Sequence, residues 1–323
     1  MLNLTKLRAG GSKTQTKFGP TDFWMLIAVI LWAVNFSLVK IALREFSPLG
    51  FNGIRLSFAS LVLLGFLAVK GEGIRLSRQD LGKLFLLGLA GNTFYQMAFI
   101  HGFDLTTASN SAIIIAVSPA IIALLSSYLK HESVHWAAWL GIIVSFVGLF
   151  LVITNQHGTV ELGRIRMKGD LLIFLGVLFW AVYTVTAKPL LERITPLKLT
   201  AISMGLGTLA YLPFCVKPIL AEDYKRISTA AWGSLLFSGF FALAVCYVIW
   251  YASVKKVGNS KTAIYDNLIP VMTVFFAWIF LGERLTVLQG VGAGVIFLGV
   301  YLARRGYLWF NRLSFLSSGR SRS

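Results

Sequence analysis

A carboxylate lies deep inside one of the apolar stretches of the chain. Asp266 is about eight residues, or ~12 Å of helix, into the apolar run 258–281. A carboxylate at such a depth can bind an amine group, or it can take up and release a proton. The alternative is a structural partner for a buried lysine or another polar neighbour. We predict proton or amine coupling for Asp266.

Polar and aromatic side chains in other apolar runs share helical faces. Trp32, Asn35 and Phe36 follow one another at i, i+3 and i+4, a spacing that places side chains on one face of a helix. Tyr95 and Gln96 contribute to a similar face in another run. Such faces predict a wet cavity with aromatic walls that suits an amphipathic ligand. The residues predicted to line this cavity are Trp32, Asn35, Phe36, Asn92, Tyr95, Gln96, Ser118, Trp180, Tyr183, Tyr247 and Tyr265.

Alternatives stay open for several aromatic and amide side chains. Asn92 and Gln96 can serve only as hydrogen-bonding contacts between helices. Trp250 and Tyr251 lie near the end of their run, where aromatic residues often form a belt at the membrane interface. These two residues therefore either line the cavity or belong to the belt.

Three basic residues lie within or at the ends of apolar runs. Lys40, Arg55 and Lys188 are predicted as gate residues or as contacts for an anionic group. The alternatives are snorkelling to the lipid headgroups for Lys40 and a structural ion pair for Arg55. Pro119 and Pro270 each remove a helix hydrogen bond. We predict that they act as hinges, with a simple change of helix shape as the alternative.

No arrangement for catalysis or metal binding is visible in the sequence. The four histidines lie in or beside predicted loops, and the chain has no His-Glu-x-x-His, Gly-x-Ser-x-Gly or Walker sequence. The two cysteines lie in separate apolar runs and form no paired site. We therefore expect no enzyme activity, no bound metal, no cofactor and no use of ATP by this chain alone.

The composition indicates a membrane protein. Of the 323 residues, 56% are hydrophobic and 13% are charged, whereas soluble domains average about 25% charged residues. This balance excludes an ordinary soluble enzyme, a disordered chain and a soluble nucleic-acid binder. Ten apolar runs approach the length of about 20 residues that a spanning helix needs, and turn or charge signals such as His101-Gly102 separate them. The runs cover 23–43, 50–69, 81–100, 107–129, 135–153, 170–191, 197–216, 230–252, 258–281 and 285–303.

The basic residues predict the orientation in the membrane. Ten helices place both termini on one side, and nineteen of the 30 Lys and Arg residues fall on that side against eight on the other. Because cytoplasmic loops are rich in Lys and Arg, we predict a multi-pass protein of the cell membrane with both termini in the cytoplasm. The cluster of Arg164, Arg166 and Lys168 is the exception to this distribution.

The second half of the chain repeats the first. A shift of 148 residues matches Asp22, Trp32 and Lys40 with Asp170, Trp180 and Lys188, and a shift of 151 residues matches Ser109, Pro119, Glu132, Gly141 and Gly148 with Ser260, Pro270, Glu283, Gly292 and Gly299. Each copy holds five apolar runs, an odd number, so the second copy must enter the membrane upside down. Inverted repeats of this kind are typical of transporters whose binding site lies between the halves.

The chain resembles the drug/metabolite transporter superfamily, EamA type. The residues that carry the resemblance are Trp32 with Lys40, Pro48 with Arg55, Pro119 and Pro270, Glu132 and Glu283, and the glycines of the fifth spans. The resemblance implies carriage of small polar or amphipathic metabolites, often amino acids or related compounds. It also suggests dimer contact through the glycine-bearing spans, with contact inside one chain as the alternative. Ser203 stands where the second copy would have the counterpart of Arg55, so a symmetric role for that arginine is not expected.

These observations together predict an all-α membrane protein with ten transmembrane helices in two inverted five-helix repeats. The predicted function is secondary transport of a small amphipathic metabolite, such as an amino acid, by alternating access. The alternatives are an intramembrane enzyme that acts on a lipid-linked substrate, and a channel. The expected partners are the substrate, membrane lipid and a second copy in a homodimer, and no nucleic acid. The predicted parts are a basic tail over 1–20, a first repeat over 21–153, a connecting loop over 154–168, a second repeat over 169–304 and a basic tail over 305–323.

Overall fold

The described part of the chain is a bundle of helices. The computed structural model describes residues 19–73, 76–129, 136–154, 160–299 and 301–302. Within these ranges short loops join helices, and no strand occurs. The predicted all-α class is therefore confirmed.

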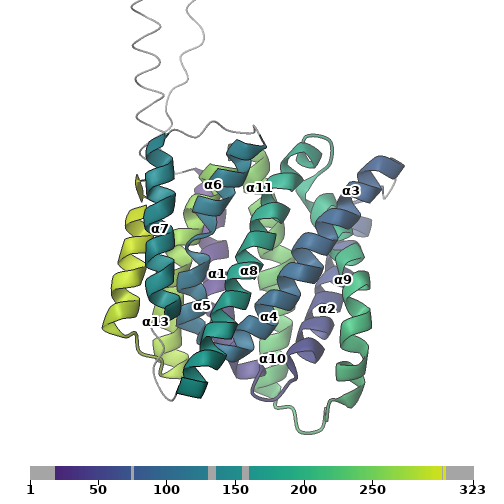
Figure 1. The fold of residues 1–323 in the computed structure, drawn as a ribbon. Coiled ribbons are helices and arrows are strands. Elements are labelled where there is room, and N and C mark those ends of the chain that lie inside the picture. The colour runs from purple at the N-terminus through teal and green to yellow at the C-terminus, as the bar shows by residue number, and fades with distance from the viewer. Residues whose placement is uncertain (1–18, 74–75, 130–135, 155–159, 300, 303–323) are drawn as a thin grey trace, which may run out of the picture.

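The helices run back and forth along the bundle (Figure 1). The first half contains α1 (Pro20–Ala42), α2 (Pro48–Val69), α3 (Arg78–Gly88), η1 (Leu89–Phe94), α4 (Tyr95–Leu105), α5 (Ala108–Ile115), α6 (Ser118–Tyr128) and α7 (Trp136–Thr154). The second half contains α8 (Val160–Leu191), α9 (Pro196–Ala221), α10 (Thr229–Phe237), η2 (Ser238–Val245), α11 (Cys246–Val257), α12 (Asn259–Ala263), η3 (Ile264–Asn267) and α13 (Leu268–Leu281). A further helix covers Val287–Gly299.

Seven helical segments in the described ranges are long and apolar enough to cross a membrane. They are Pro20–Ala42, Pro48–Val69, Ala108–Tyr128, Gly163–Leu191, Pro196–Ala221, Thr229–Val257 and Asn259–Leu281. The other predicted spans coincide with α3–η1–α4, α7 and the helix Val287–Gly299. The chain is a multi-pass membrane protein, and the count of ten spans stays a prediction.

Two predicted boundaries are wrong. The pair His101-Gly102 lies inside α4 and does not separate two spans. Gly102 allows a close approach between helices instead, because a Cβ on it would lie 2.7 Å from the carbonyl oxygen of Gly169. The connecting loop predicted over 154–168 is shorter in the structure, because α8 begins at Val160. Residues 160–169 contain no proline that would interrupt this helix.

Matching caps begin the second span of each repeat. The Ser47 hydroxyl accepts a hydrogen bond from the Gly50 backbone N–H at the start of α2 (3.2 Å), and the Thr195 hydroxyl accepts one from the Lys198 N–H at the start of α9 (3.1 Å). A proline follows each cap. An N–H at this first helical position would have no partner within the helix, so proline costs no hydrogen bond there. The same local signal therefore starts α2 and α9, which pack side by side.

The third and fourth spans are interrupted at corresponding places in both repeats. The third span of the first repeat contains the π-helical segment η1, and its counterpart contains η2. Each fourth span also breaks: at residues 116–117 between α5 and α6, and in the 3₁₀ turn η3 before α13. Irregular backbone in transporters is typical of the interface between repeats, where the binding site lies. The repeats therefore match in structure as well as in sequence.

The two repeats enter the bundle from opposite ends. We name the end at which α1 begins the proximal end and the opposite end the distal end. Asp22, near the start of α1, bonds to Tyr265 at the proximal end. Asp170, its counterpart in α8, bonds to Thr106 at the distal end, beside Lys40. The repeats are therefore inverted, as their odd number of spans predicts.

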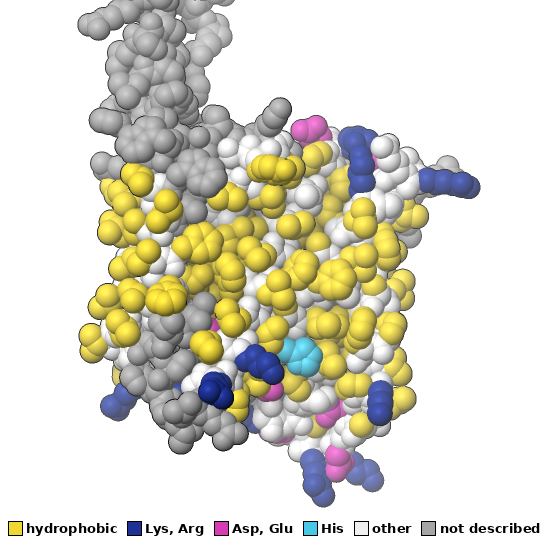
Figure 2. All heavy atoms as spheres, in the orientation of Figure 1, with side chains coloured by type: hydrophobic (Ala, Val, Ile, Leu, Met, Phe, Trp, Pro, Cys, Tyr) yellow, Lys and Arg dark blue, Asp and Glu magenta, His cyan; other side chains and the backbone are white. Residues whose placement is uncertain are grey.

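The outer surface fits a lipid environment. Figure 2 shows hydrophobic side chains over the middle of one face, and Lys, Arg, Asp and Glu side chains gathered toward its two edges. Many large apolar residues of the described chain are exposed, including Leu61, Phe150 and Trp278. Because an apolar surface of this extent is unusual on a soluble monomer, it supports the multi-pass assignment.

Candidate functional site

An aromatic cluster joins the two repeats at the centre of the bundle. The matched residues Trp32 and Trp180 meet edge to face, with ring centroids 6.3 Å apart. Tyr95 and Tyr247 flank Trp180 at 5.4 and 5.2 Å. The indole N–H of Trp32 donates to the carbonyl oxygen of Ala242 in η2 (2.9 Å). The cluster thus fixes α1 against the π-helical segment of the opposite repeat.

A small cavity lies beside this cluster. Its volume is about 60 Å³, which has room for a few water molecules and is well below the roughly 300–1,000 Å³ of ordinary ligand sites. The cavity is therefore too small for an ordinary ligand in this form. The lining residues are Trp32, Asn35, Phe36, Arg55, Tyr95, Gln96, Phe99, Ile115, Val177, Trp180, Ala242, Leu243, Tyr247, Asp266 and Ile269.

Arg55 supplies the positive charge of the cavity. Its guanidinium donates to the Ser238 hydroxyl (2.8 Å) and to the side-chain oxygens of Asn52 (2.5 Å) and Gln96 (2.7 Å). It also lies over the ring of Phe51, 5.3 Å from the centroid. Only 1% of the residue is exposed. In the described part of the chain, the Arg55 Nε has no hydrogen-bond partner, so this donor is available to a ligand or to water.

Asp266 supplies the negative charge. It lies in η3, where the fourth span of the second repeat is broken, and one carboxylate oxygen accepts from the Ser118 hydroxyl (2.5 Å). Pro119 and Pro270 lie in the first turns of α6 and α13, directly after the two breaks. Ile115 is the counterpart of Asp266 in the first repeat and also lines the cavity. The carboxylate is therefore a feature of one repeat only.

Two carboxylates bind the repeats together at opposite ends of the bundle. At the proximal end, Asp22 accepts hydrogen bonds from the Tyr265 hydroxyl and from the Gly19 N–H. At the distal end, one oxygen of Asp170 accepts from the Thr106 hydroxyl and from the Asn110 amide, each at 2.6 Å. We name these contacts the proximal clamp and the distal clamp. Each joins the first span of one repeat to the other repeat.

A second set of carboxylates satisfies helix N-termini across the repeats. Glu222 accepts from the Ser47 N–H (2.9 Å) and hydroxyl, and Glu72 accepts from the Thr195 hydroxyl (2.5 Å). Glu283 accepts from the N–H groups of residues 108 and 109 (both 2.9 Å). Carboxylates at these positions stabilise the partial positive charge of a helix N-terminus. Glu283 therefore caps α5 of the opposite repeat and not the helix that follows it. Its counterpart Glu132 lies outside the described residues.

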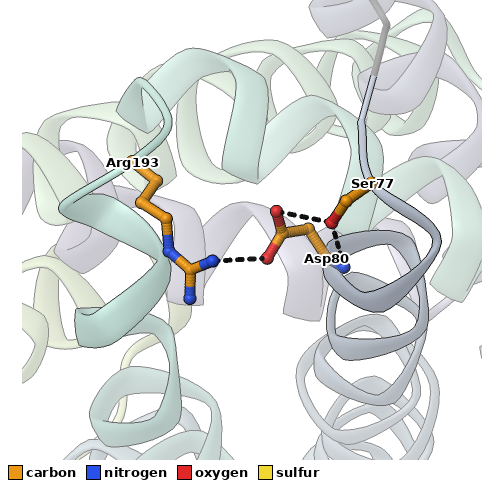
Figure 3. A network of polar contacts seen from close by, with 3 residues as sticks. All are labelled: Ser77, Asp80 and Arg193. Atoms are coloured by element: carbon orange, nitrogen blue, oxygen red, sulfur yellow. Dashed lines mark hydrogen bonds and ion pairs between the residues drawn. The ribbon is translucent and has the colours of Figure 1, made fainter.

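An ion pair adds to the proximal end. Asp80, near the start of α3, lies 3.4 Å from the guanidinium of Arg193 (Figure 3). The Asp80 carboxylate also accepts from the Ser77 hydroxyl (2.9 Å), which in turn accepts from the Asp80 N–H. The Arg193 side chain is 55% exposed, so this pair contributes little to stability. Asp80 is a buried carboxylate that does not line the cavity.

The structure brings together most of the predicted lining residues and separates four of them. Asn92 and Tyr183 bond to each other (3.3 Å) behind the cavity. Ser118 touches it only through Asp266, and Tyr265 belongs to the proximal clamp. The predicted residues that border the cavity are Trp32, Asn35, Phe36, Tyr95, Gln96, Trp180, Tyr247, Asp266 and Arg55. Gln96 and Tyr247 also hydrogen-bond across the repeats (3.0 Å), as the alternative for Gln96 predicts.

The two predicted lysines lie away from the cavity. The Lys40 ammonium donates to the carbonyl oxygens of Phe103 and Asp104 at the end of α4. A cation there stabilises the C-terminus of that helix, so Lys40 does not snorkel freely. Lys188 is half-buried near the end of α8. Only Arg55 of the three predicted cationic residues reaches the cavity.

The belt alternative for Trp250 and Tyr251 is wrong. Both residues are fully buried, and the Trp250 indole donates to the Thr184 hydroxyl (3.3 Å). Proximity to the end of a span predicts the membrane interface only for a side chain that faces lipid. Here α11 turns these residues inward, and Trp250 packs against Trp180 with centroids 5.4 Å apart.

The glycines of the fifth spans pack inside the chain. A Cβ on Gly148 would lie 2.7 Å from the carbonyl oxygen of Gly292, and a Cβ on Gly299 would lie 2.5 Å from that of Gly141. The Ser145 hydroxyl also donates to Gly141 (3.0 Å). Small residues therefore let α7 approach the helix Val287–Gly299 closely, as the intramolecular alternative predicts.

Several residues of the site have no clear signal in the sequence. Ser238 and Asn52 position Arg55, and Val177 and Leu243 line the cavity. Phe99 also lines it, and its spacing from Tyr95 and Gln96 places it on their helical face. The repeat match of Asp22 with Asp170 is visible in the sequence, and it could have identified the clamp carboxylates. Among the residues that the structure describes, no three His, Cys, Asp or Glu side chains gather as metal ligands.

This architecture defines a class of protein. Inverted repeats around a central polar cavity, with broken helices at the repeat interface, are typical of membrane transporters. The model of the EamA-like transporter family matches residues 19–154 and 167–305, once in each repeat. The chain belongs to this family.

Relatives and a solved structure agree with this assignment. An uncharacterized transporter of Bacillus subtilis, YyaM, is 30% identical over 85% of this chain and 90% of its own length. A probable terminal-alkyne amino-acid exporter of Streptantibioticus cattleyicolor is 28% identical over 87% of this chain and 93% of its own. A crystal structure with 14% identity superposes with a TM-score of 0.66 over 90% of this chain and 98% of that chain, which supports the fold. The chain is thus a membrane transporter.

Proposed function

We propose that the protein is a secondary transporter of a small zwitterionic metabolite, an amino acid or a related compound. The observation that carries this proposal is the presence of Arg55 and Asp266 in one cavity, with 1% and 2% of each residue exposed. A guanidinium can bind a carboxylate and a carboxylate can bind an ammonium group. Their aromatic neighbours offer apolar surface to the remainder of such a substrate.

Two unpartnered polar atoms support a polar ligand in the cavity. Within the described residues, the Arg55 Nε donor and the Asn35 Oδ1 acceptor have no hydrogen-bond partner. A buried polar group without a partner is costly. A substrate carboxylate at Arg55 and a substrate N–H at Asn35 would remove that cost. One donor and one acceptor in the same cavity favour a ligand with groups of both kinds.

Asp266 is the proposed coupling residue. A carboxylate within a span can exchange a proton when its surroundings alternate between open and closed states. The Ser118 hydroxyl bonds to it from the opposite repeat, so movement between the repeats changes the environment of this carboxylate. Proton release or amine binding can thus be linked to the motion.

Alternating access is the proposed mechanism. The cavity is too small for a substrate in this form, and contacts between the repeats hold both ends of the bundle. Opening one end requires that its clamp breaks while the other clamp remains. The helix breaks before Pro119 and Pro270 are the proposed hinges, because the regular α-helical hydrogen bonding there gives way to tighter turns.

The proposed location is the cell membrane, with the proximal end in the cytoplasm. The excess of Lys and Arg in the segments assigned to that side supports this orientation. A relative that is named as a probable amino-acid exporter supports the proposed substrate class.

Uptake of a panel of radiolabelled amino acids into proteoliposomes, with and without a pH gradient, tests the proposal. Arg55→Gln should lower uptake of the active substrate to background, because its carboxylate loses its cation. Asp266→Asn should remove the effect of the pH gradient. Asp80→Asn is the matched control, since this buried carboxylate lies outside the cavity, and it should retain pH-dependent uptake.

Uptake of no amino acid by the wild-type protein would contradict the substrate class. An Asp266→Asn variant with the same pH dependence as the wild type would contradict proton coupling. Size-exclusion chromatography of each purified variant identifies a variant that has merely failed to fold.

A further inference from the structure

A second hollow lies at the proximal end, outside the central cavity. It has a volume of about 670 Å³ and runs between the start of α1, the end of α2 and α11. Its walls therefore come from both repeats. The lining residues are Pro20, Thr21, Trp24, Leu63, Phe66, Lys70, Leu197, Ala244, Val245, Val248, Ile249, Ala252, Ser253 and Lys256. We name this hollow the proximal groove.

The proximal groove is apolar along its length and cationic at its rim. Phe66 and Trp24 are 48% and 52% exposed, so the groove presents large apolar surfaces. Lys70 and Lys256 are exposed and follow the last apolar turns of α2 and α11. An apolar channel that ends at two positive charges matches a ligand with an apolar tail and an anionic head.

The length of the groove matches one leaflet of a membrane. From Ala244 to Lys256 the helix advances by twelve residues, or ~18 Å at 1.5 Å per residue. Half of a bilayer hydrocarbon core is about 15 Å thick. The length of the groove therefore matches that of an acyl chain whose headgroup lies at the proximal end.

The acidic groups near the rim are already engaged within the protein. Asp22 accepts from Tyr265 and from the Gly19 N–H, and Glu72 accepts from Thr195. The Asp22 carboxylate also interacts electrostatically with Lys256, and both rim lysines remain exposed to an incoming headgroup. The segment before Gly19 is not a suitable occupant, because residues 1–18 contain four Lys and Arg residues and no Asp or Glu, and the lysines would repel it.

We propose that the proximal groove binds one anionic phospholipid. Its acyl chain lies against α2 and α11, and its phosphate lies between Lys70 and Lys256. Pockets with basic residues at the membrane interface are known to bind anionic headgroups. Consecutive residues of η2 border the two spaces, since Ala242 and Leu243 line the cavity and Ala244 and Val245 line the groove. The bound lipid therefore contacts a wall of the central cavity.

Native mass spectrometry of the full-length protein measures this binding without any need for transport. The purified protein is incubated with detergent micelles that contain equal amounts of phosphatidylglycerol and phosphatidylcholine. The wild type should retain phosphatidylglycerol about tenfold better, a difference of ~1.4 kcal/mol. The double variant Lys70→Gln/Lys256→Gln should lose this preference. The control Lys217→Gln/Lys225→Gln, which removes two exposed lysines at the distal end, should keep it.

A second variant tests the apolar part of the groove. Ala252 is exposed and lines the groove, so Ala252→Trp should fill it and lower retention of both lipids. Equal retention of the two lipids by the wild type would overturn the proposal. A Lys70→Gln/Lys256→Gln variant that behaves like the distal control would also overturn it. These results are independent of whether the protein transports an amino acid.

Discussion

The distal and proximal clamps are built from equivalent aspartates and differ in strength. Asp170 is fully buried and accepts two hydrogen bonds from the opposite repeat, each at 2.6 Å. Asp22 is half-buried and accepts one such bond, from Tyr265, beside one from its own helix start. A hydrogen bond to a charged group contributes about 1.5–3 kcal/mol, and water weakens this at an exposed site. The two clamps are thus asymmetric, and the proposed alternating access predicts that the proximal end opens more readily.

Removal of the distal clamp should have the largest effect on access to the cavity. Asp170→Ala removes the acceptor of both bonds, so the distal end should open more often, by at least about tenfold on the scale of one charged hydrogen bond. The measurement is the rate at which a membrane-impermeant thiol reagent, applied from the distal side, labels an Asn35→Cys variant. Cys215 and Cys246, both buried, are replaced by alanine in this background. An unchanged distal labelling rate would show that Asp170 does not close that end.

Removal of the proximal clamp should have a smaller effect, on the opposite side. Asp22→Ala breaks one hydrogen bond between the repeats. Because the site is half-buried, water can accept a hydrogen bond from the Tyr265 hydroxyl and offset part of the lost stabilisation. Labelling of the Asn35→Cys variant from the proximal side should rise several-fold, on the basis of about 0.5–1.5 kcal/mol for an ordinary hydrogen bond. A larger rise than Asp170→Ala produces at the distal side would reverse the order of the two clamps.

The smallest expected effect concerns a carboxylate outside the spans. The backbone N–H and the hydroxyl of Ser228 donate to Glu45 (2.6 and 2.8 Å) and lower the pKa of this carboxyl below its usual value. Because the pKa is lower in the folded than in the unfolded state, the stabilisation is present at neutral pH. It is lost as the pH falls through the folded pKa.

Glu45→Gln should therefore lower the melting temperature slightly at pH 7, and the difference from the wild type should vanish in acid. Thermal unfolding in detergent between pH 3 and pH 7 measures this change. A difference that grows as the pH falls would contradict the assigned contact.

The sequence predicts the general architecture better than the contacts between the repeats. Composition and the periodic apolar runs indicate an all-α membrane bundle, and the matched Trp32 and Trp180 do meet at its centre. These features are local or follow from duplication. By contrast, Arg55 bonds to Ser238, which is 183 positions away, and no spacing rule connects the two residues.

The orientation of a side chain around its helix is also difficult to predict. Trp250 and Tyr251 lie near the end of a span, yet α11 buries both of them. The π-helical segments η1 and η2 rotate the residues that follow them, and a regular 3.6-residue period does not include this rotation. Predictions of lining residues are therefore least accurate beyond such interruptions, where side-chain direction depends on tertiary contacts.

Chemical locking of the distal clamp shows whether the two ends of the cavity open alternately. A Thr106→Cys/Asp170→Cys variant, in a background without Cys215 and Cys246, is crosslinked with a short bifunctional thiol reagent in proteoliposomes. Alternating access predicts that uptake stops on crosslinking. In a variant that also carries Asn35→Cys, this thiol should still react from the proximal side after the distal clamp is locked. Undiminished uptake by fully crosslinked protein would contradict a cavity that opens alternately at its two ends.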